Sequence, residues 1–153
     1  MITDGRATLS IYSTEMTAVE ITTALGIVPS KTYEQGDLTP SGRAGRLLKP
    51  QYLTYQQAGW HLDAPDSVDD PDAFRSLRAL VRSIERKAEV LRTLRPACDT
   101  VIRWYGSSDS SQGGFVMDAE LLVGLAALGC DLVGTAYLSS AEPELESDRE
   151  SQV

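Results

Sequence analysis

The stretch FRSLRALVRSIERKAEVLRTL, residues 74–94, decides the fold class of this chain. Its apolar residues recur at alternating steps of three and four, which places them on one face of a long amphipathic helix. Asp70 is expected to cap this helix, with Pro71 at the first helical position and Asp72 at the positive end of the dipole. Pro96 is expected to end it. The apolar stripe consists of Phe74, Leu77, Leu80, Val81, Ile84, Ala88, Leu91 and Leu94.

The segment before this helix begins with a predicted strand and a short helix. Residues 7–13 alternate apolar and polar side chains, which is the period of a half-buried strand. Thr17 and Glu20 form a capping box for a helix that runs to about Leu25. Gly26 is expected to end that helix in left-handed backbone.

Proline and glycine interrupt the region from residue 27 to residue 57 repeatedly, so its assignment rests on short patterns. Short strands are predicted at residues 31–35 and 52–55. A strand is also predicted at residues 59–63. The predicted loop at residues 37–49 carries Arg43, Arg46 and Lys49.

The segment after the long helix predicts a strand at residues 100–105, a turn-rich loop at 106–114 and a brief pairing segment at 115–117. Asp118 should cap a third helix, which Gly129 ends, and residues 131–138 form a last strand. Short helices flanked by strands must bury their apolar stripes on the sheet. We therefore predict an α+β fold of β-α-β-β-α-β-α-β order. Its mixed, mainly antiparallel sheet carries about three helices packed on one face.

Composition and charge limit the classes of function. The chain has 153 residues, of which 42% are hydrophobic, and residues 1–139 are expected to form one domain. Residues 140–153 hold five acidic residues and one arginine, which predicts an acidic disordered tail. The net charge of −8 disfavours nucleic acid as a partner and favours a basic protein.

The location of the protein is predicted from what the sequence lacks. It holds no apolar run of about 20 residues and no signal-peptide core, which predicts a cytoplasmic protein without a membrane partner. Cys98 and Cys130 are too few for a secreted disulfide scaffold, so both are expected to be reduced and at least half buried.

Two groups of residues, one in each half of the chain, resemble a known family in their type and order. The first group comprises residues 8–12 and 20–30, Gly36, Asp37 and Trp60. The second comprises Leu77, Leu80, Ile84, Lys87, Ala88, Leu91, Leu94, Tyr105, Gly106, residues 112–115, Leu121, Leu122 and residues 125–129. In this order they resemble a bacterial family, the domain of unknown function 4279, over residues 7–138. The resemblance implies no assigned activity and no catalytic residues.

The candidate binding residues lie in two segments. His61 is the only histidine, and it follows Trp60 on a predicted strand. A role in acid–base chemistry would require a partner pocket, and a histidine beside a core tryptophan is the alternative interpretation. The glycine-rich loop lacks the lysine of a phosphate-binding loop, yet its backbone amides remain available to a ligand. The tentative ligand- or partner-binding residues are Trp60, His61, Tyr105, Asp109, Gln112, Gly113 and Gly114.

The sequence contains no paired catalytic groups, no metal-spaced histidines and no cofactor motif. We therefore expect no metal, no cofactor and no catalytic residues, and a non-enzymatic module that binds a protein, of an immunity or accessory type. The alternative is a small-molecule-binding domain or a minor enzyme with its site near Trp60, His61 and residues 106–114. Homo-oligomerisation stays open because Tyr52, Tyr55 and Trp60 are candidates for an exposed apolar edge.

Overall fold

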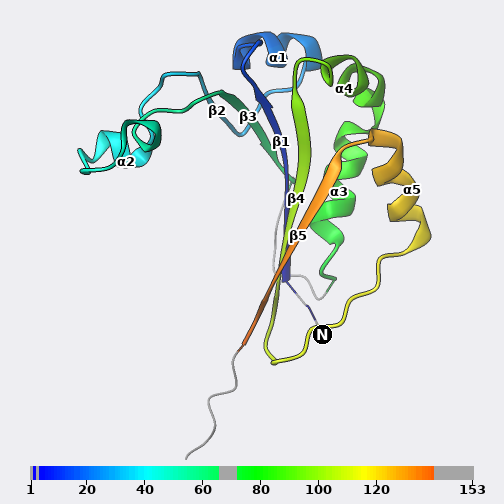
Figure 1. Ribbon diagram of the computed structural model, residues 1–153. Coiled ribbons are helices and arrows are strands. Elements are labelled where there is room, and N and C mark those ends of the chain that lie inside the picture. The colour runs from blue at the N-terminus through cyan, green and yellow to red at the C-terminus, as the bar shows by residue number, and fades with distance from the viewer. Residues whose placement is uncertain (1, 3, 66–71, 140–153) are drawn as a thin grey trace, which may run out of the picture.

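A computed structural model describes residue 2, residues 4–65 and residues 72–139 (Figure 1). Its centre is a five-stranded sheet in the order β2-β3-β1-β4-β5. β1 pairs antiparallel with β3 and β4, β2 pairs antiparallel with β3, and β4 pairs parallel with β5. The prediction of a mixed, mainly antiparallel sheet is therefore confirmed. The strands are β1 (Asp4–Ser13), β2 (Lys31–Tyr33), β3 (Ala58–Asp63), β4 (Asp99–Ser108) and β5 (Asp131–Leu138).

α1, α3, α4 and α5 lie on one face of this sheet, whereas α2 lies apart from them, on the segment between β2 and β3 (Figure 1). α1 packs against β3, α3 packs against β1, and α4 and α5 pack against each other. The predicted order of strands and helices is confirmed, with a short helix and two 3₁₀ turns in addition. The helices are α1 (Ala18–Leu25), α2 (Pro40–Arg43), α3 (Arg75–Ile84), α4 (Ala88–Leu94) and α5 (Ala119–Leu128).

Local capping fixes the ends of the two helices that sequence patterns predicted most closely. The Thr17 hydroxyl accepts from the Glu20 amide while the Glu20 carboxylate accepts from the Thr17 amide, so the capping box is confirmed. Asp118 caps α5 by accepting from the Leu121 amide. Gly26 and Gly129 end α1 and α5 with φ of 64° and 63°, which is the left-handed backbone that glycine adopts at little cost.

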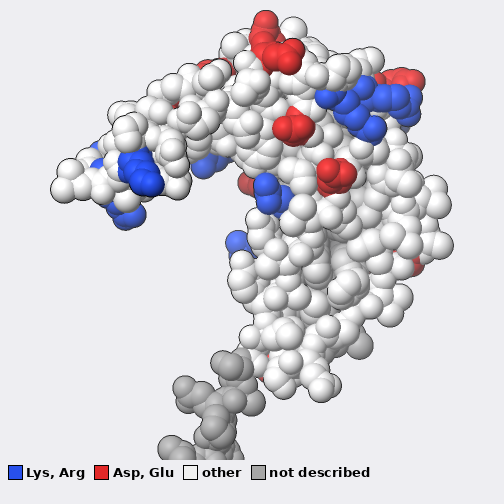
Figure 2. Space-filling model, viewed as in Figure 1, with Lys and Arg blue, Asp and Glu red and all other residues white. Residues whose placement is uncertain are grey.

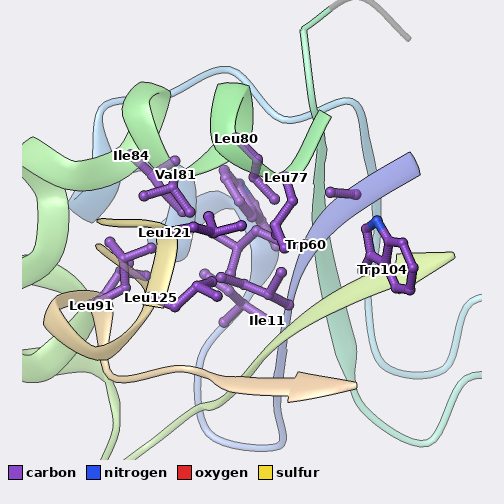
Figure 3. Close-up of a cluster of buried hydrophobic side chains, with 14 of the residues drawn as sticks. Ile11, Trp60, Leu77, Leu80, Val81, Ile84, Leu91, Trp104, Leu121 and Leu125 are labelled. Atoms are coloured by element: carbon purple, nitrogen blue, oxygen red, sulfur yellow. The ribbon is translucent and has the colours of Figure 1, made fainter. Parts of the chain in front are cut away.

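The core lies between the sheet and the helices. Figure 3 shows apolar side chains of α3 and α5 directed toward Ile11 and Trp60 of the sheet. Both of these sheet residues are 0% exposed, and the Trp60 indole donates to the Thr22 hydroxyl on α1 at 3.0 Å. Burying such side chains contributes about 1.5–3 kcal/mol each, which makes this layer the main source of stability.

The long helix differs from its prediction in two ways. It is divided into α3 and α4 by a 3₁₀ turn at Glu85–Lys87, because both halves pack on α5 but α3 also packs on β1 while α4 packs on α1. It also begins at Arg75, later than predicted. The Asp72 carboxylate accepts from the Phe74 amide and caps the preceding turn. The predicted cap at residues 70 and 71 lies outside the described residues.

Four shorter predictions were also wrong. Residues 52–55 form no strand, because Pro50 opens a 3₁₀ turn through Tyr52 and Thr54 makes only an isolated bridge with Leu38. The predicted loop at 37–49 contains α2. β4 extends to Ser108 into the predicted loop 106–114, and residues 115–117 form no strand because the Phe115 ring packs near Phe74 and Trp104.

Residues 34–57, which we call the arm, connect β2 to β3 and project away from the sheet (Figure 1). The arm contains α2 and the 3₁₀ turn at Pro50–Tyr52. The predicted disordered tail, residues 140–153, lies outside the described residues. Within the described part of the chain, no helix is long and apolar enough to cross a membrane.

Candidate functional site

The face of the sheet turned away from the helices is not covered by any described helix, and we call it the open face. Side chains alternate along a strand, so the neighbours of the core residues in β1, β3 and β4 point to this opposite face. The register sets the residues of the open face side by side, with Ser10 opposite His61 and Thr8 opposite Arg103. The open face consists of Arg6, Thr8, Ser10, Tyr12, Lys31, Tyr33, Gly59, His61, Asp63, Asp99, Val101, Arg103, Tyr105, Ser107, Asp131, Val133, Thr135 and Tyr137.

Aromatic rings gather at the β2 side of the open face. The His61 ring lies 5.5 Å from the ring of Tyr12 and 5.5 Å from that of Tyr33. Tyr33 in turn stacks on Tyr55 of the arm, with centroids 3.6 Å apart and planes 9° apart. The Tyr33 ring lies over Gly59, where an added Cβ would come within 2.2 Å of it. Glycine at this position therefore makes room for the aromatic cluster.

The surroundings of His61 favour its neutral form. Its Nδ1 lies 3.0 Å from the hydroxyl oxygen of Ser10, which is buried beneath the cluster. Burial lowers the pKa of His61 first, and the nearby positive charge of Lys31 lowers it further; Asp63 opposes the shift. The Asp63 carboxylate accepts from the Thr8 hydroxyl at 2.7 Å. Burial likewise raises the pKa of Tyr33. The cluster is thus aromatic and neutral at its centre.

Charged side chains surround this centre. The pKa of Arg103 is raised mainly by its side-chain hydrogen bond with Tyr12, and Tyr105 adds to the same effect. Figure 2 shows a hollow between the arm and the sheet, with basic side chains on both sides of it. The basic side chains on this side of the molecule slightly outnumber the acidic ones, which are Asp63, Asp99 and Asp131 on the open face and Glu34 and Asp37 on the arm. The basic residues are Arg6, Lys31 and Arg103 on the sheet and Arg43, Arg46 and Lys49 on the arm.

The site residues predicted from the sequence fall into separate places. Trp60 lies in the core, where its side chain is out of reach of a surface partner. His61 and Tyr105 share the open face but not a position on it, since they lie opposite Ser10 and Arg6 of β1. Arg103 lies between them on this face, opposite Thr8, and it interacts with both Tyr12 and Tyr105.

The glycine-rich turn lies at the far end of β4. Asp109 is exposed there. Gln112 and Gly114 line a cavity of about 610 Å³ together with Ile2, Phe74 and Phe115. A Cβ at Gly113 would come within 2.7 Å of Leu138, so this glycine allows the turn to pack against the end of β5. The turn therefore contributes to a different surface from His61.

Sequence reasoning did not select Tyr12, Tyr33, Tyr55 and Arg103 as site residues. Tyr12 and Arg103 follow from the alternation of β1 and β4 once the apolar side of each strand is assigned to the core. The contribution of Tyr55 depends on the path of the arm, which no local pattern reveals.

The remaining reactive groups do not form a reaction centre in the described part of the chain. No group of three or more histidine, cysteine, aspartate or glutamate residues there is placed to hold a metal ion. Cys98 is buried and Cys130 half-buried, and both are free, as predicted. Burial raises the pKa of both thiols, which disfavours the reactive thiolate.

Comparison with known proteins gives one match. The model of a family described as Domain of unknown function (DUF4279) matches residues 3–139. No curated protein and no solved structure matches the chain.

Proposed function

The chain belongs to the family Domain of unknown function (DUF4279), and we propose that it is a non-enzymatic module that binds a protein partner through the open face. The observation that carries this proposal is the cluster of Tyr12, Tyr33, His61 and Arg103 on a sheet face that no described helix covers. A sheet with one face packed and one face in solvent commonly carries polar residues on its solvent side. Here that side carries aromatic rings in addition to polar residues such as Thr8 and Thr135.

The chemistry of the cluster supports binding to a protein. Tyrosine and arginine are among the residues that contribute most to binding energy at protein interfaces. Tyr105 is 38% exposed, so it is available at the surface. The stacked pair of Tyr33 and Tyr55 is held by the arm and needs little ordering when a partner binds.

The arm extends this surface on its other side. Leu47 is 103% exposed and Tyr52 is 55% exposed, and both lie close in sequence to basic residues of the arm. Exposed apolar side chains with a charged rim are typical of interaction sites. The proposed partner therefore lies in the hollow between the arm and the open face.

The charge of this hollow specifies the partner further. The net charge of −8 predicts a basic partner. That prediction concerns the acidic surface outside the hollow. Lys31, Arg103 and the basic residues of the arm favour an acidic segment within the hollow. Two free thiols fit a reducing compartment, so the proposal places the protein in the cytoplasm.

Affinity capture with matched charge reversals tests this proposal. The full chain is used as bait in a native lysate, beside Arg103→Glu on the open face and Arg82→Glu on the exposed side of α3. We expect a specific protein to be recovered with the wild-type chain and with Arg82→Glu, and lost with Arg103→Glu. Equal recovery with both variants would refute the role of the open face, provided that both unfold at the same urea concentration as the wild type.

A small-molecule site is the second candidate, and the cavity beside the glycine-rich turn favours it. Ile2, Phe74 and Phe115 line much of it, and Gln112 supplies an amide, which is a combination suited to a small apolar ligand with one polar group. Native mass spectrometry of the chain purified from cells would reveal a co-purified ligand as an added mass that denaturation removes. The absence of any added mass would count against this candidate.

A further inference from the structure

The two edges of the sheet are built very differently. β2, at one edge, has three residues, carries an exposed lysine at Lys31 and continues into the arm. Short edge strands and edge lysines are two of the ways in which proteins prevent unwanted strand pairing. β5, at the other edge, has eight residues, and no proline or lysine occurs in it. Its register with β4 is continuous, so no bulge twists it away.

β5 also exposes apolar side chains on both faces of the sheet. Val133 and Tyr137 lie on the open face, where they are 43% and 61% exposed. Leu132 and Leu138 lie on the helix face and are 38% and 47% exposed. They stay exposed because α5 packs on α3 and α4 rather than over β5. Residues 132–138 therefore form an uncharged, unpaired edge in the described structure.

We infer that β5 is a dimerisation edge and that it pairs antiparallel with β5 of a second copy of this chain. Two copies related by a twofold axis present the same strand to each other. Residues opposite each other in an antiparallel pair point to the same face of the sheet. Paired residue numbers must therefore both be odd or both be even, which restricts the register to a few choices.

The register centred on Thr135 pairs the apolar residues best. It sets Val133 opposite Tyr137 of the second copy, twice over, on the open face. It sets Leu132 opposite Leu138 of the second copy, also twice, on the helix face. Pairs of aromatic and β-branched side chains stabilise adjacent strands. The register centred on Gly134 would instead bring Asp131 opposite Tyr137, so the Thr135 register is favoured.

Charge is compatible with this arrangement. Asp131 is the only charged residue of β5. The register centred on Thr135 sets it opposite the uncharged Ser139 of the second copy, so no like charges of the two strands face each other.

The dimer would extend one sheet across both copies, with the helices of both on one side. Both open faces would then lie on the opposite side, next to each other. This consequence does not depend on what the open face binds.

Charge substitution at the axis tests the inference and its register together. Thr135→Lys places two lysines opposite each other, and Thr135→Glu does the same with two glutamates, whereas a mixture of the two variants pairs lysine with glutamate. We expect the full wild-type chain to dimerise in sedimentation equilibrium. We expect each variant alone to dimerise about tenfold or more weakly, and the mixture to recover a heterodimer. Thr93→Lys on α4, an exposed threonine, is the control and should dimerise like the wild type.

Each contrary result overturns the inference. A wild-type chain that stays monomeric up to millimolar concentration would exclude the dimer. Thr135→Lys and Thr135→Glu chains that each dimerise as strongly as the wild type would exclude β5 as the interface. Weakening without recovery in the mixture would exclude the register centred on Thr135. Far-ultraviolet circular dichroism identical to that of the wild type confirms for each variant that the fold is intact.

Discussion

The two faces of the sheet are made by neighbouring residues of the same strands, yet they serve different ends. Trp60 points into the core and is 0% exposed, while the next residue, His61, points to the open face and is only partly buried. On the helix face the side chains are apolar and interlocked, so changes there act on stability. On the open face they are aromatic and charged, so changes of exposed side chains there should act mainly on binding. One strand can contribute to both the core and the binding surface because its side chains alternate between the two faces of the sheet.

The largest expected difference separates Trp60 from His61. Trp60→Ala should lower the free energy of unfolding by about 3–5 kcal/mol, because it empties a filled core position and removes the bond to Thr22. His61→Ala, one residue away, should lower it by less than about 1 kcal/mol. Urea unfolding followed by circular dichroism measures both. Comparable losses for the two variants would contradict the division between the faces.

Gly59→Ala should have the next largest effect, and it acts from the open face. An added methyl group would overlap the far end of the Tyr33 ring, so this ring must shift and its stacking on Tyr55 is disturbed. We expect a loss of about 1–3 kcal/mol in the free energy of unfolding. The change should also displace the ring resonances of both tyrosines in the NMR spectrum. Gly114→Ala, which has open space around it, is the control and should change stability by about 0.5 kcal/mol or less.

Removal of the capping box at α1 tests how far the helix layer depends on local bonds. Thr17→Ala leaves the Glu20 amide without its side-chain acceptor and should lower the free energy of unfolding by about 1 kcal/mol. Thr23→Ala removes an exposed hydroxyl that only bonds back to Val19 within the same helix, and it should have little effect. Equal losses of the free energy of unfolding in urea would show that the capping bond of Thr17 does not stabilise the fold more than the hydroxyl of Thr23 does.

The smallest effect concerns pH. Burial lowers the pKa of His61 in the folded chain below the ordinary value of 6.5, so the unfolded chain binds more protons there. The free energy of unfolding should therefore decrease as the pH falls through about 6.5, and it should level off below the folded pKa. Glu20 and Asp118 titrate at lower pH, since hydrogen bonds lower the pKa of both carboxyls. The decrease between pH 7.5 and 5.5 should be absent in His61→Gln. If that variant keeps it, another group is responsible.

The parts of the fold that sequence predicted correctly are those set by local bonds. The capping box of α1, the cap at Asp118 and the left-handed glycines at positions 26 and 129 each involve residues within one turn, so their pattern is visible in the chain. The order of strands and helices follows from the same local periodicities. The division of the long helix was not predictable, because it depends on which neighbours each half meets.

The candidate site was predictable only in part. His61 and Tyr105 were selected as single residues of unusual type. The face they share is assembled from β2, β3, β1 and β4, which are not adjacent in sequence. Strand order and register decide which polar faces of the strands lie together, and the pattern within a single segment predicts neither of them. Trp60 was selected for its type, but the alternation of β3 directs it into the core.

Site-specific photo-crosslinking tests the central claim, that the open face is the binding face, most directly. Benzoylphenylalanine replaces Tyr105 on the open face in one full-length chain and Leu122, which is 51% exposed on α5, in another. After irradiation in cells, we predict a discrete adduct with a second protein from position 105 and none from position 122. An adduct from position 122 alone, or from neither position, would contradict the account.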